Sequence, residues 1–480
     1  MSEPSRPLAG ARASRASLLV RMRERDHTRG SLLASVAVLS LPSIATGALG
    51  FGFFQLVDLR FLALLGDAEV AAAGATNQTL RQVFMLLMMG LGVSSQLWIA
   101  RHVGEGRVDA AEHVAGQSFV IGAAIATLGV LTCGLFPETF AALVTPDPEV
   151  LDLATRYVRI TFLLIGLMVA MQVFHAVLQG AGDATTPMLV TLLVTPISIG
   201  AEWALAFGHL GLPALGISGM ALGASFGGLC GLGVAGWALF SGRCRVHLRA
   251  RHLIPDPEGL RRLLSTAWQP ALHMVARTST VFFFMALGGR LGGKVQAAYT
   301  IGLRVEMIGI MVAFPVAGAC ATLVGQNLGA GDLRRAWRAI FVSAGVSAGA
   351  LWPAALSLFL WREHFVAVFT RDPEVARLAT EYLGYSAAIL CFYGFYFIAF
   401  RTLQAAGDMR SPMVISIATA GLLAVPLGYV LATRTEFGAS GMWIASFVYA
   451  AVNCAITVGW LLCGRWTRRH GPAPATPASV

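Results

Sequence analysis

The sequence predicts an all-α polytopic membrane protein in which twelve transmembrane helices form two parallel six-helix repeats. Its 480 residues are 56% hydrophobic and only 12% charged, whereas an ordinary soluble domain is about 25% charged. Mean hydropathy is +0.69, and apolar runs long enough to cross ~30 Å of hydrocarbon follow one another along the chain. Motifs of the first half also return in the second half. These properties exclude a soluble enzyme, a disordered chain and a disulfide scaffold.

The apolar runs predict the twelve helices in order, with boundaries good to a few residues. We expect them at 32–64, 70–98, 112–135, 150–178, 187–208, 213–240, 262–288, 294–325, 335–361, 376–402, 411–432 and 438–463. Because this number is even, both ends of the chain are expected on the same side of the membrane.

The basic residues predict which side that is. Most of the 35 Lys and Arg residues fall in the two tails and the even-numbered loops, so the positive-inside rule predicts cytoplasmic termini. We expect a multi-pass protein of the bacterial inner (plasma) membrane. The net charge of +10 is spread between apolar runs and predicts no nucleic-acid partner. The predicted organisation is a basic cytoplasmic tail at 1–30, an N-lobe at 31–240, a cytoplasmic linker at 241–262, a C-lobe at 263–464 and a cytoplasmic tail at 465–480. A transit peptide is the alternative for the first tail, but no cleavable apolar region follows it.

Four motifs recur in order and indicate an internal duplication. Three of them recur at one constant spacing along the chain, and the fourth recurs at nearly the same spacing. The pairs are Thr145–Val150 with Thr370–Val375, Leu178–Asp183 with Leu403–Asp408, Val103–Gly106 with Leu328–Gly331, and Gly216–Met220 with Gly438–Met442. Six helices per copy give both copies the same orientation in the membrane, so the repeats are parallel. Two like bundles around a central cavity predict a transporter.

At these motifs the chain resembles the multidrug and toxic compound extrusion (MATE) family, in its DinF-like branch. The matching stretches are Leu56–Leu59 on the first helix, Leu178–Pro187 between the fourth and fifth, and Leu323–Asp332 after the eighth. The resemblance spans about 32–463. It implies two six-helix lobes arranged as a V. It also implies cation-driven export of bulky, often cationic amphiphiles.

Asp58 is a candidate proton-binding residue, because it lies well inside the first predicted helix. A charge at such a depth is costly and usually faces a cavity or a partner. Burial favours the neutral form of a carboxylate, which permits reversible protonation. The alternative is a salt bridge to Arg60 or Arg81; Arg60 is only two residues away on another helical face, which favours Arg81. The family resemblance, with its first-helix acid, supports the proton site.

Glu202 and Ser198 are the second candidate cation- or proton-binding pair. They follow Pro196 in the fifth predicted helix, where a proline can free carbonyl oxygens. The resemblance aligns them with the Asn and Asp of the family's fifth-helix pattern, so carboxylate chemistry is kept. The alternative is that Glu202 lies at the outer end of its helix, in water among the lipid headgroups.

Further polar residues within the helices are candidates for the substrate cavity or a gate. They are Gln55, Asn77, Arg81, Arg277, Glu306, Tyr393 and Tyr396. Glu306 and Arg81 occupy equivalent positions of the two copies, so they could face each other across the cavity. The alternative is that Arg277 or Arg304 neutralises Glu306 within its own lobe. The two tyrosines offer a ring face to a cation and a hydroxyl.

The leading functional hypothesis is proton-coupled antiport of amphiphilic, often cationic small molecules by alternating access. Na⁺ is less expected as the coupling ion, because the seventh and tenth helices lack acids at the depth where sodium-coupled relatives carry them. A flippase for lipids or lipid-linked glycans and an Na⁺-coupled exporter are the alternatives. We expect a monomer in the lipid bilayer, and no cofactor, metal or catalytic residue.

Two motifs that imitate enzyme sites support that last expectation. Gly288–Lys294 resembles a phosphate-binding loop but is followed by Val295 instead of Ser or Thr. Gly216–Gly219 resembles a protease nucleophile motif, but it recurs with the repeat, as a close-packing turn would.

Overall fold

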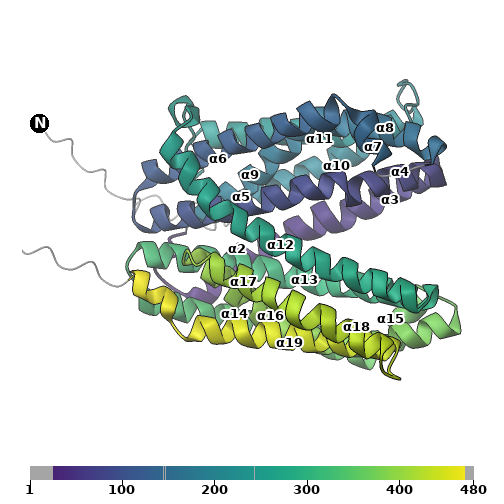
Figure 1. Ribbon diagram of the computed structural model, residues 1–480. Coiled ribbons are helices and arrows are strands. Elements are labelled where there is room, and N and C mark those ends of the chain that lie inside the picture. Colours follow the sequence, from purple (N-terminus) through teal and green to yellow (C-terminus); the bar gives the residue numbers. More distant parts are fainter. Residues whose placement is uncertain (1–24, 144, 146, 243, 471–480) are drawn as a thin grey trace, which may run out of the picture.

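The computed structural model describes residues 25–143, 145, 147–242 and 244–470 and is built of helices (Figure 1). Most of the predicted 1–30 tail and the last ten residues lie outside these residues. We call α2–α11 the N-lobe and α12–α19 the C-lobe.

The N-lobe helices carry six predicted spans. They are α2 (Leu32–Gly47) with the π-helix η1 (Ala48–Phe53) and α3 (Phe54–Leu65); α4 (Asp67–Gln78) with α5 (Leu80–Gly104); α6 (Val108–Gly129) with the π-helix η2 (Val130–Gly134); the short α7 (Pro137–Ala142); α8 (Pro148–Leu163) with α9 (Ile165–Ala181); α10 (Thr185–Phe207); and α11 (Ile217–Phe240).

The C-lobe repeats this order after a 3-10 turn, η3 (Ala250–Leu253). Its elements are α12 (Pro257–Leu291), α13 (Gly293–Gly329), α14 (Leu333–Leu360), the short α15 (Arg362–Ala367), α16 (Pro373–Ala405), α17 (Arg410–Thr419) with η4 (Ala420–Ala424) and α18 (Val425–Thr433), α19 (Ala439–Leu462) and η5 (Arg465–His470).

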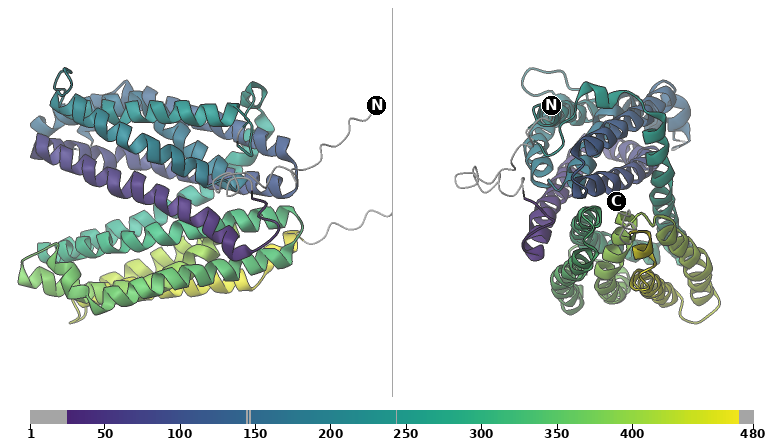
Figure 2. Two further views of the ribbon diagram at one scale, coloured as in Figure 1. Left: turned by 180° about the vertical axis from the view of Figure 1, so that it is seen from behind. Right: turned by 90° about the vertical axis from the view of Figure 1, so that its left-hand side faces the viewer.

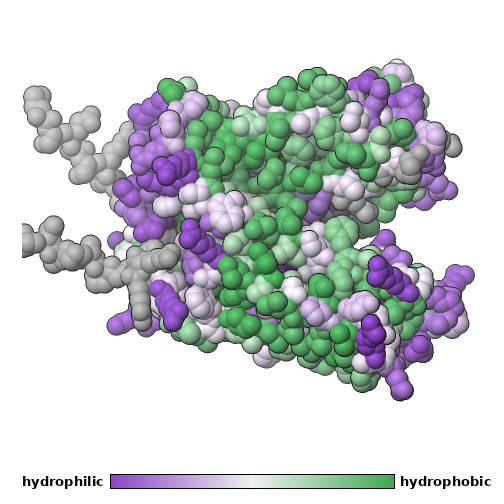
Figure 3. All heavy atoms as spheres, in the orientation of Figure 1, coloured by the Kyte–Doolittle hydropathy of each residue, from purple (hydrophilic) through white to green (hydrophobic). Residues whose placement is uncertain are grey.

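The predicted helices are present, and one of them is bent. Within the part of the chain that the structure describes, eleven helical segments are long and apolar enough to cross a membrane. The fourth predicted helix is divided into α8 and α9, which meet at Leu164 with a 50° bend and together make a twelfth span. Hydrophobic side chains form a central belt between two hydrophilic ends (Figure 3), as expected where the surface faces lipid.

The repeated Leu-Gln-x-Ala-Gly-Asp motif turns the chain between helices at equivalent corners of the two lobes. Gly182 and Gly407 have φ of +88° and +83°, a left-handed conformation that favours glycine. The next residue of the motif caps the following helix: Asp183 accepts from the Thr186 backbone N–H at 2.9 Å, and Asp408 accepts from that of Ser411 at 3.2 Å.

The two lobes are in contact at the end where α2 begins and α19 ends, which we call the terminus end. They diverge toward the opposite, far end (Figure 1), where the surface is indented between them (Figure 3). Glycines allow the close contact: a Cβ at Gly104 would collide with the carbonyl oxygen of Gln326, and one at Gly329 with that of Arg101. The helices α5 and α13 therefore cross backbone to backbone.

The first helix of each lobe reaches into the other lobe at the terminus end. Val36 and Leu39 of α2 pack in the C-lobe core, whereas Leu62 of α3 packs in the N-lobe core. In the opposite sense, Leu263 of α12 packs in the N-lobe core and Phe284 of the same helix in the C-lobe. Both crossings are visible, α12 in Figure 1 and the purple first helix in the left view of Figure 2.

The linker between the lobes is fastened to α6. The Gln117 amide nitrogen donates to the carbonyl oxygens of His252 and Ile254, at 3.0 and 2.8 Å, and its oxygen accepts from Asp256 N–H at 2.9 Å. Glu112 accepts from His247 N–H at 3.0 Å. The linker is thus held against the N-lobe.

Candidate functional site

Glu202 lies in the interior of the N-lobe, where α10 packs on α11. Its side chain is 0% exposed, and neither carboxylate oxygen has a hydrogen-bond partner among the described residues. Glycines of α11 bring the two helices together: a Cβ at Gly223 would collide with the Glu202 backbone, and one at Gly227 with the Ser198 hydroxyl. This small-residue face packs like the interfaces typical of membrane helices. The alternative that Glu202 lies in water at the helix end is therefore wrong.

Asp58 of α3 is half-buried in the N-lobe and close enough to Glu202 for the two charges to interact. The charges of Asp58 and Glu202 interact, as do those of Asp58 and Arg81. Arg81 also donates to the Asn77 amide oxygen at 3.2 Å, and Asn77 donates to the Tyr157 hydroxyl at 3.4 Å. Hydrogen bonds or charge interactions thus connect five side chains, Asp58, Asn77, Arg81, Tyr157 and Glu202, from α3, α4, α5, α8 and α10; we call them the N-lobe cluster.

Four of these five residues are candidates from the sequence, and Tyr157 is the exception. Tyr157 belongs to α8, whose sequence carries charged residues at its start, so nothing in the sequence marks this tyrosine. Gln55, a predicted cavity residue, has an exposed side chain on α3. Arg60, the less favoured partner of Asp58, is also exposed. Ser198 is buried one turn before Glu202 on the same face of α10.

The C-lobe holds a separate cluster around Glu306 of α13. The Glu306 carboxylate is 5% exposed and accepts from the hydroxyls of Tyr382, Ser386 and Tyr393 of α16, at 2.7, 2.9 and 3.4 Å. Arg277 of α12 interacts with the charge of Glu306. Glu306 is therefore satisfied inside its own lobe.

Arg277 lies among aromatic rings next to this carboxylate. Its guanidinium is 5.6 Å from the ring centre of Tyr393 and 5.1 Å from that of Phe397. One turn earlier on α12, His273 is buried and its Nε2 lies 2.9 Å from the Tyr396 hydroxyl. The His273 ring also stacks on Phe400 at 4.1 Å. These contacts place Arg277, Glu306, Tyr393 and Tyr396 in one region.

Arg81 and Glu306, the two charges predicted to form a gate, each have partners in their own lobe. Arg81 interacts with Asp58 and Asn77 in the N-lobe, and Glu306 interacts with Arg277 and α16 in the C-lobe. The geometry therefore corresponds to the alternative, neutralisation within each lobe. Arg304, the other candidate partner of Glu306, is exposed.

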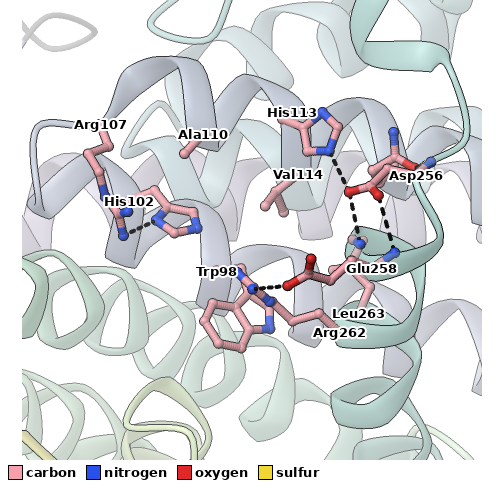
Figure 4. Close-up of a pocket in the computed structure, with 12 residues that line it drawn as sticks. Trp98, His102, Arg107, Ala110, His113, Val114, Asp256, Glu258, Arg262 and Leu263 are labelled. Carbon is pink, nitrogen blue, oxygen red and sulfur yellow. Dashed lines mark hydrogen bonds and ion pairs between the residues drawn. The ribbon is translucent and has the colours of Figure 1, made fainter.

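A recess at the terminus end lies between α5, α6 and the start of α12, and holds about 240 Å³ (Figure 4). Its charged groups are paired with one another. The Asp256 carboxylate is 3.1 Å from His113 Nε2 and caps α12 by accepting from Gly259 N–H at 3.0 Å. Arg262 pairs with Glu258 at 3.3 Å and lies over the Trp98 ring. The recess therefore joins α12 to the N-lobe, and these described residues leave little charge free for a cofactor.

Asp109, Glu112 and His252 form a group of metal-ligand type nearby, with ligand atoms within 4.8 Å of one another. The Arg251 guanidinium lies on Asp109, and Glu112 accepts from the linker backbone. Asp109 and Glu112 therefore already bind groups of the linker. A bound cation would compete with the Arg251 guanidinium for Asp109.

The sequence matches one family and several multidrug resistance proteins. The MatE family model matches residues 42–203 and 270–430. The "Probable multidrug resistance protein NorM" of Thermotoga maritima is 25% identical over 90% of this chain and 92% of its own length. Its namesake in Deinococcus radiodurans is 29% identical over 81% and 86%. The "Multidrug resistance protein PmpM" of Pseudomonas aeruginosa is 24% identical over 98% and 95%.

The fold matches solved structures of the same kind. A MATE crystal structure in a bent conformation has a TM-score of 0.85 and 20% identity, covering 94% of this chain and 98% of its own. An outward-facing multidrug resistance MATE transporter has a TM-score of 0.84 and 20% identity, covering 92% and 97%.

Proposed function

The chain belongs to the MatE family of multidrug efflux transporters, and from this premise we propose that it exchanges protons for amphiphilic, often cationic compounds. It is a transporter and not an enzyme. We propose a monomer in the bacterial inner membrane with both termini in the cytoplasm.

The buried, unpartnered carboxylate of Glu202 is the observation that carries this proposal. A carboxylate taken out of water without hydrogen bonds costs several kcal/mol while it is charged. It is therefore stable there with a proton or with a bound cation. To remain buried, such a carboxylate must bind a proton or a cation, and it can release that ion when water enters. It is therefore suited to coupling ion movement to substrate transport.

The neighbouring Asp58 makes proton binding at Glu202 depend on the state of the whole N-lobe cluster. Two carboxylates close to each other disfavour the state in which both are ionised, so proton binding at one depends on the charge of the other. Removal of Asp58, or of the nearby charge of Arg81, should therefore change how readily Glu202 takes up a proton.

In the proposed cycle, substrate leaves at the far end, where the lobes diverge. Protons arriving from that side neutralise the N-lobe cluster and displace the substrate. The π-helix η1 immediately precedes the helix that carries Asp58, and π-turns interrupt the regular hydrogen-bond ladder at functional sites. The first helix can change its course there, after which the lobes rock and the proton leaves on the cytoplasmic side.

The stoichiometry decides how this exchange responds to membrane voltage. Moving one charge through 100 mV is worth about 2.3 kcal/mol. Exchange of one proton for one monovalent cation moves no net charge, so the pH gradient alone drives it. Two protons per cation add the voltage as a driving force.

The alternatives make different demands on the arginines and on Glu202. A flippase for lipids or lipid-linked glycans needs cations free to bind pyrophosphate, whereas Arg81 and Arg277 already have partners in their lobes. An Na⁺-coupled exporter would use Glu202 with neighbouring oxygens such as that of Ser198. The Ser198 hydroxyl lies one turn from Glu202 on α10 and is an oxygen of the kind that hard cations bind. The Na⁺-coupled alternative is therefore included in the test.

The experiment is uptake of a fluorescent cationic dye into inverted vesicles, driven by a pH gradient with and without Na⁺. The variants are Glu202→Gln and Asp58→Asn, which keep the size of each side chain and remove its charge. Glu436→Gln, an exposed acid between α18 and α19, is the matched control. We expect proton-driven uptake in the wild type and the control, and its loss in both cluster variants.

Other results would assign the function differently. If only an Na⁺ gradient drives uptake, the coupling ion is Na⁺ and not the proton. Full uptake in both cluster variants would move coupling elsewhere in the chain. Absence of dye transport in the wild type would favour the flippase.

A further inference from the structure

The glutamines of the repeated Leu-Gln-x-Ala-Gly-Asp motif lie where the lobes meet, and the proposed function assigns them no task. Gln179 lies in the last turn of α9 in the N-lobe, and Gln404 lies in the last turn of α16 in the C-lobe. The carbonyl oxygen of Gln179 accepts from the Thr322 hydroxyl of the C-lobe at 2.9 Å. The Gln404 amide oxygen accepts from Arg401 of the same helix at 3.0 Å, and Gln404 lines a small recess together with Gln96 of α5. Both motif copies therefore lie at the contact that closes the terminus end.

Gln96 of α5 links these two points. Its amide nitrogen donates to the Gly318 carbonyl and the Thr322 hydroxyl of α13, at 3.1 and 2.9 Å. Its amide oxygen accepts a hydrogen bond from the Arg401 guanidinium. The closed end is thus sealed by amide and hydroxyl groups that cross repeatedly between the lobes. Such groups bind water well, so polar contact alone is a weak barrier to protons.

Arg401 is the charged member of this seal. It is 4% exposed, and none of the ion pairs found among the described residues includes it. Its Nε has no partner there, and its guanidinium lies 5.6 Å from the Phe314 ring centre. A buried cation that is not paired with a carboxylate is costly. No carboxylate among the described residues neutralises its positive charge, which therefore repels any cation that enters the seal.

We propose that Arg401 is a cationic barrier that keeps protons and small cations from leaking through the closed terminus end. A fixed arginine excludes cations in the same way in selective pores. The proposal rests on the proposed function, since a transporter driven by a cation gradient loses that gradient if its closed end leaks. It also gives Gln404 of the motif a task, because Gln404 and Gln96 of α5 hold the guanidinium in place.

The test measures the collapse of an imposed pH gradient in proteoliposomes that contain no drug. Arg401→Gln removes the charge and can still donate a hydrogen bond, whereas Arg401→Lys keeps the charge. Arg410→Gln, an exposed arginine at the same end, is the control. Release of trapped glucose from the same vesicles reports any general opening of the protein, and thermal unfolding in detergent checks that each variant is folded.

We expect proton leak through Arg401→Gln to rise about tenfold or more, because one unit charge acts strongly on another a few ångströms away in a medium of intermediate dielectric. Arg401→Lys and Arg410→Gln should leak like the wild type, and glucose release should not change. An unchanged proton leak in Arg401→Gln overturns the proposal. An equal rise of proton and glucose leak also overturns it, because the residue would then only fasten the lobes.

This test is separate from that of the proposed function. The leak is measured without substrate and does not depend on which residue couples transport. Loss of proton-driven dye uptake by Glu202→Gln with an unchanged leak in Arg401→Gln would leave the coupling site supported and the barrier refuted.

Discussion

Gly104 and Gly329 each lie against the backbone of the opposite lobe, and they do so at equivalent positions of the repeat. Gly104 approaches Gln326, and Gly329 approaches Arg101. Gly329 corresponds to Gly104, and Gln326 to Arg101, at the spacing that separates the repeated motifs. The two contacts are thus related by the same local symmetry that relates the lobes. The closed end is therefore assembled around one shared crossing of α5 and α13.

Alanine at either glycine should destabilise the closed end, because its Cβ would meet a backbone carbonyl that has little room to move. We expect each of Gly104→Ala and Gly329→Ala to cost about 1–3 kcal/mol, the usual effect of overpacking. Thermal unfolding in detergent, followed by tryptophan fluorescence, measures this. Gly349→Ala on α14, where a Cβ meets open space, should be neutral or stabilising. A loss at one of the two glycines alone would contradict their equivalence.

Alanine at Gly223 or Gly227 of α11 should push α10 away and disturb Glu202 and Ser198. We expect proton-driven dye uptake to be lost, together with about 1–3 kcal/mol of stability. Gly233→Ala and Gly236→Ala lie on the same helix and have nothing within 4 Å of the added Cβ. These two variants should transport normally. Normal uptake by Gly223→Ala would show that the spacing of α10 and α11 is unimportant for the site.

Removal of the Tyr382 hydroxyl should destabilise the C-lobe. Tyr382→Phe leaves the buried Glu306 carboxylate without its 2.7 Å donor, and an acceptor left unsatisfied costs about 1–3 kcal/mol. Tyr385→Phe, nearly one turn further along the same helix, is the control, because its ring is less buried. Unfolding temperatures in detergent compare them. Equal values for the two variants would mean that Ser386 and Tyr393 fully replace the lost donor.

The stability of the protein should fall between pH 6.5 and about 4 through His27. Burial lowers the pKa of this ring from 6.5 to about 4, and its Nε2 lies 3.1 Å from the Gly182 carbonyl oxygen. Arg245 and Arg25 lower the pKa further, while Asp26 opposes them. The unfolded chain thus binds a proton in this window before the folded one does. Stability is complete above pH 6.5 and is lost as the pH falls, by no more than about 3 kcal/mol.

His27→Gln should remove this part of the pH dependence. The comparison is the unfolding temperature of wild type and variant between pH 7 and 4. The two curves of unfolding temperature against pH should converge toward low pH. As the pH rises, the unfolding temperature of the wild type should increase relative to that of the variant. Parallel curves would show that His27 does not titrate on unfolding.

Much of the fold followed from the sequence, because long apolar runs admit few structures in a membrane and the repeat offsets fix their order. The cluster residues Asp58, Arg81 and Glu202 could also be singled out, since charges are rare at that depth. The bend at Leu164 could not, because nothing in the composition of that run marks a break.

The aromatic and amide partners were harder to predict. Tyr157 lies among the charged residues of α8, and Tyr382 directly follows Glu381 in α16, so neither position stands out in the sequence as part of a buried polar contact. His273 is a single polar residue between apolar neighbours of α12. Arg401 lies at the end of an apolar run, where a count of basic charges assigns it to the following loop. Only the packing of α16 against α5 shows that it is buried.

The crossing of α2 into the C-lobe and of α12 into the N-lobe has a consequence for assembly. Each half of the molecule completes its core with a helix from the other half. Gln117 also holds the connecting segment by hydrogen bonds, and these bonds do not require the chain to be continuous between the lobes. Two separately expressed polypeptides, divided within 241–256, should therefore associate into a working heterodimer.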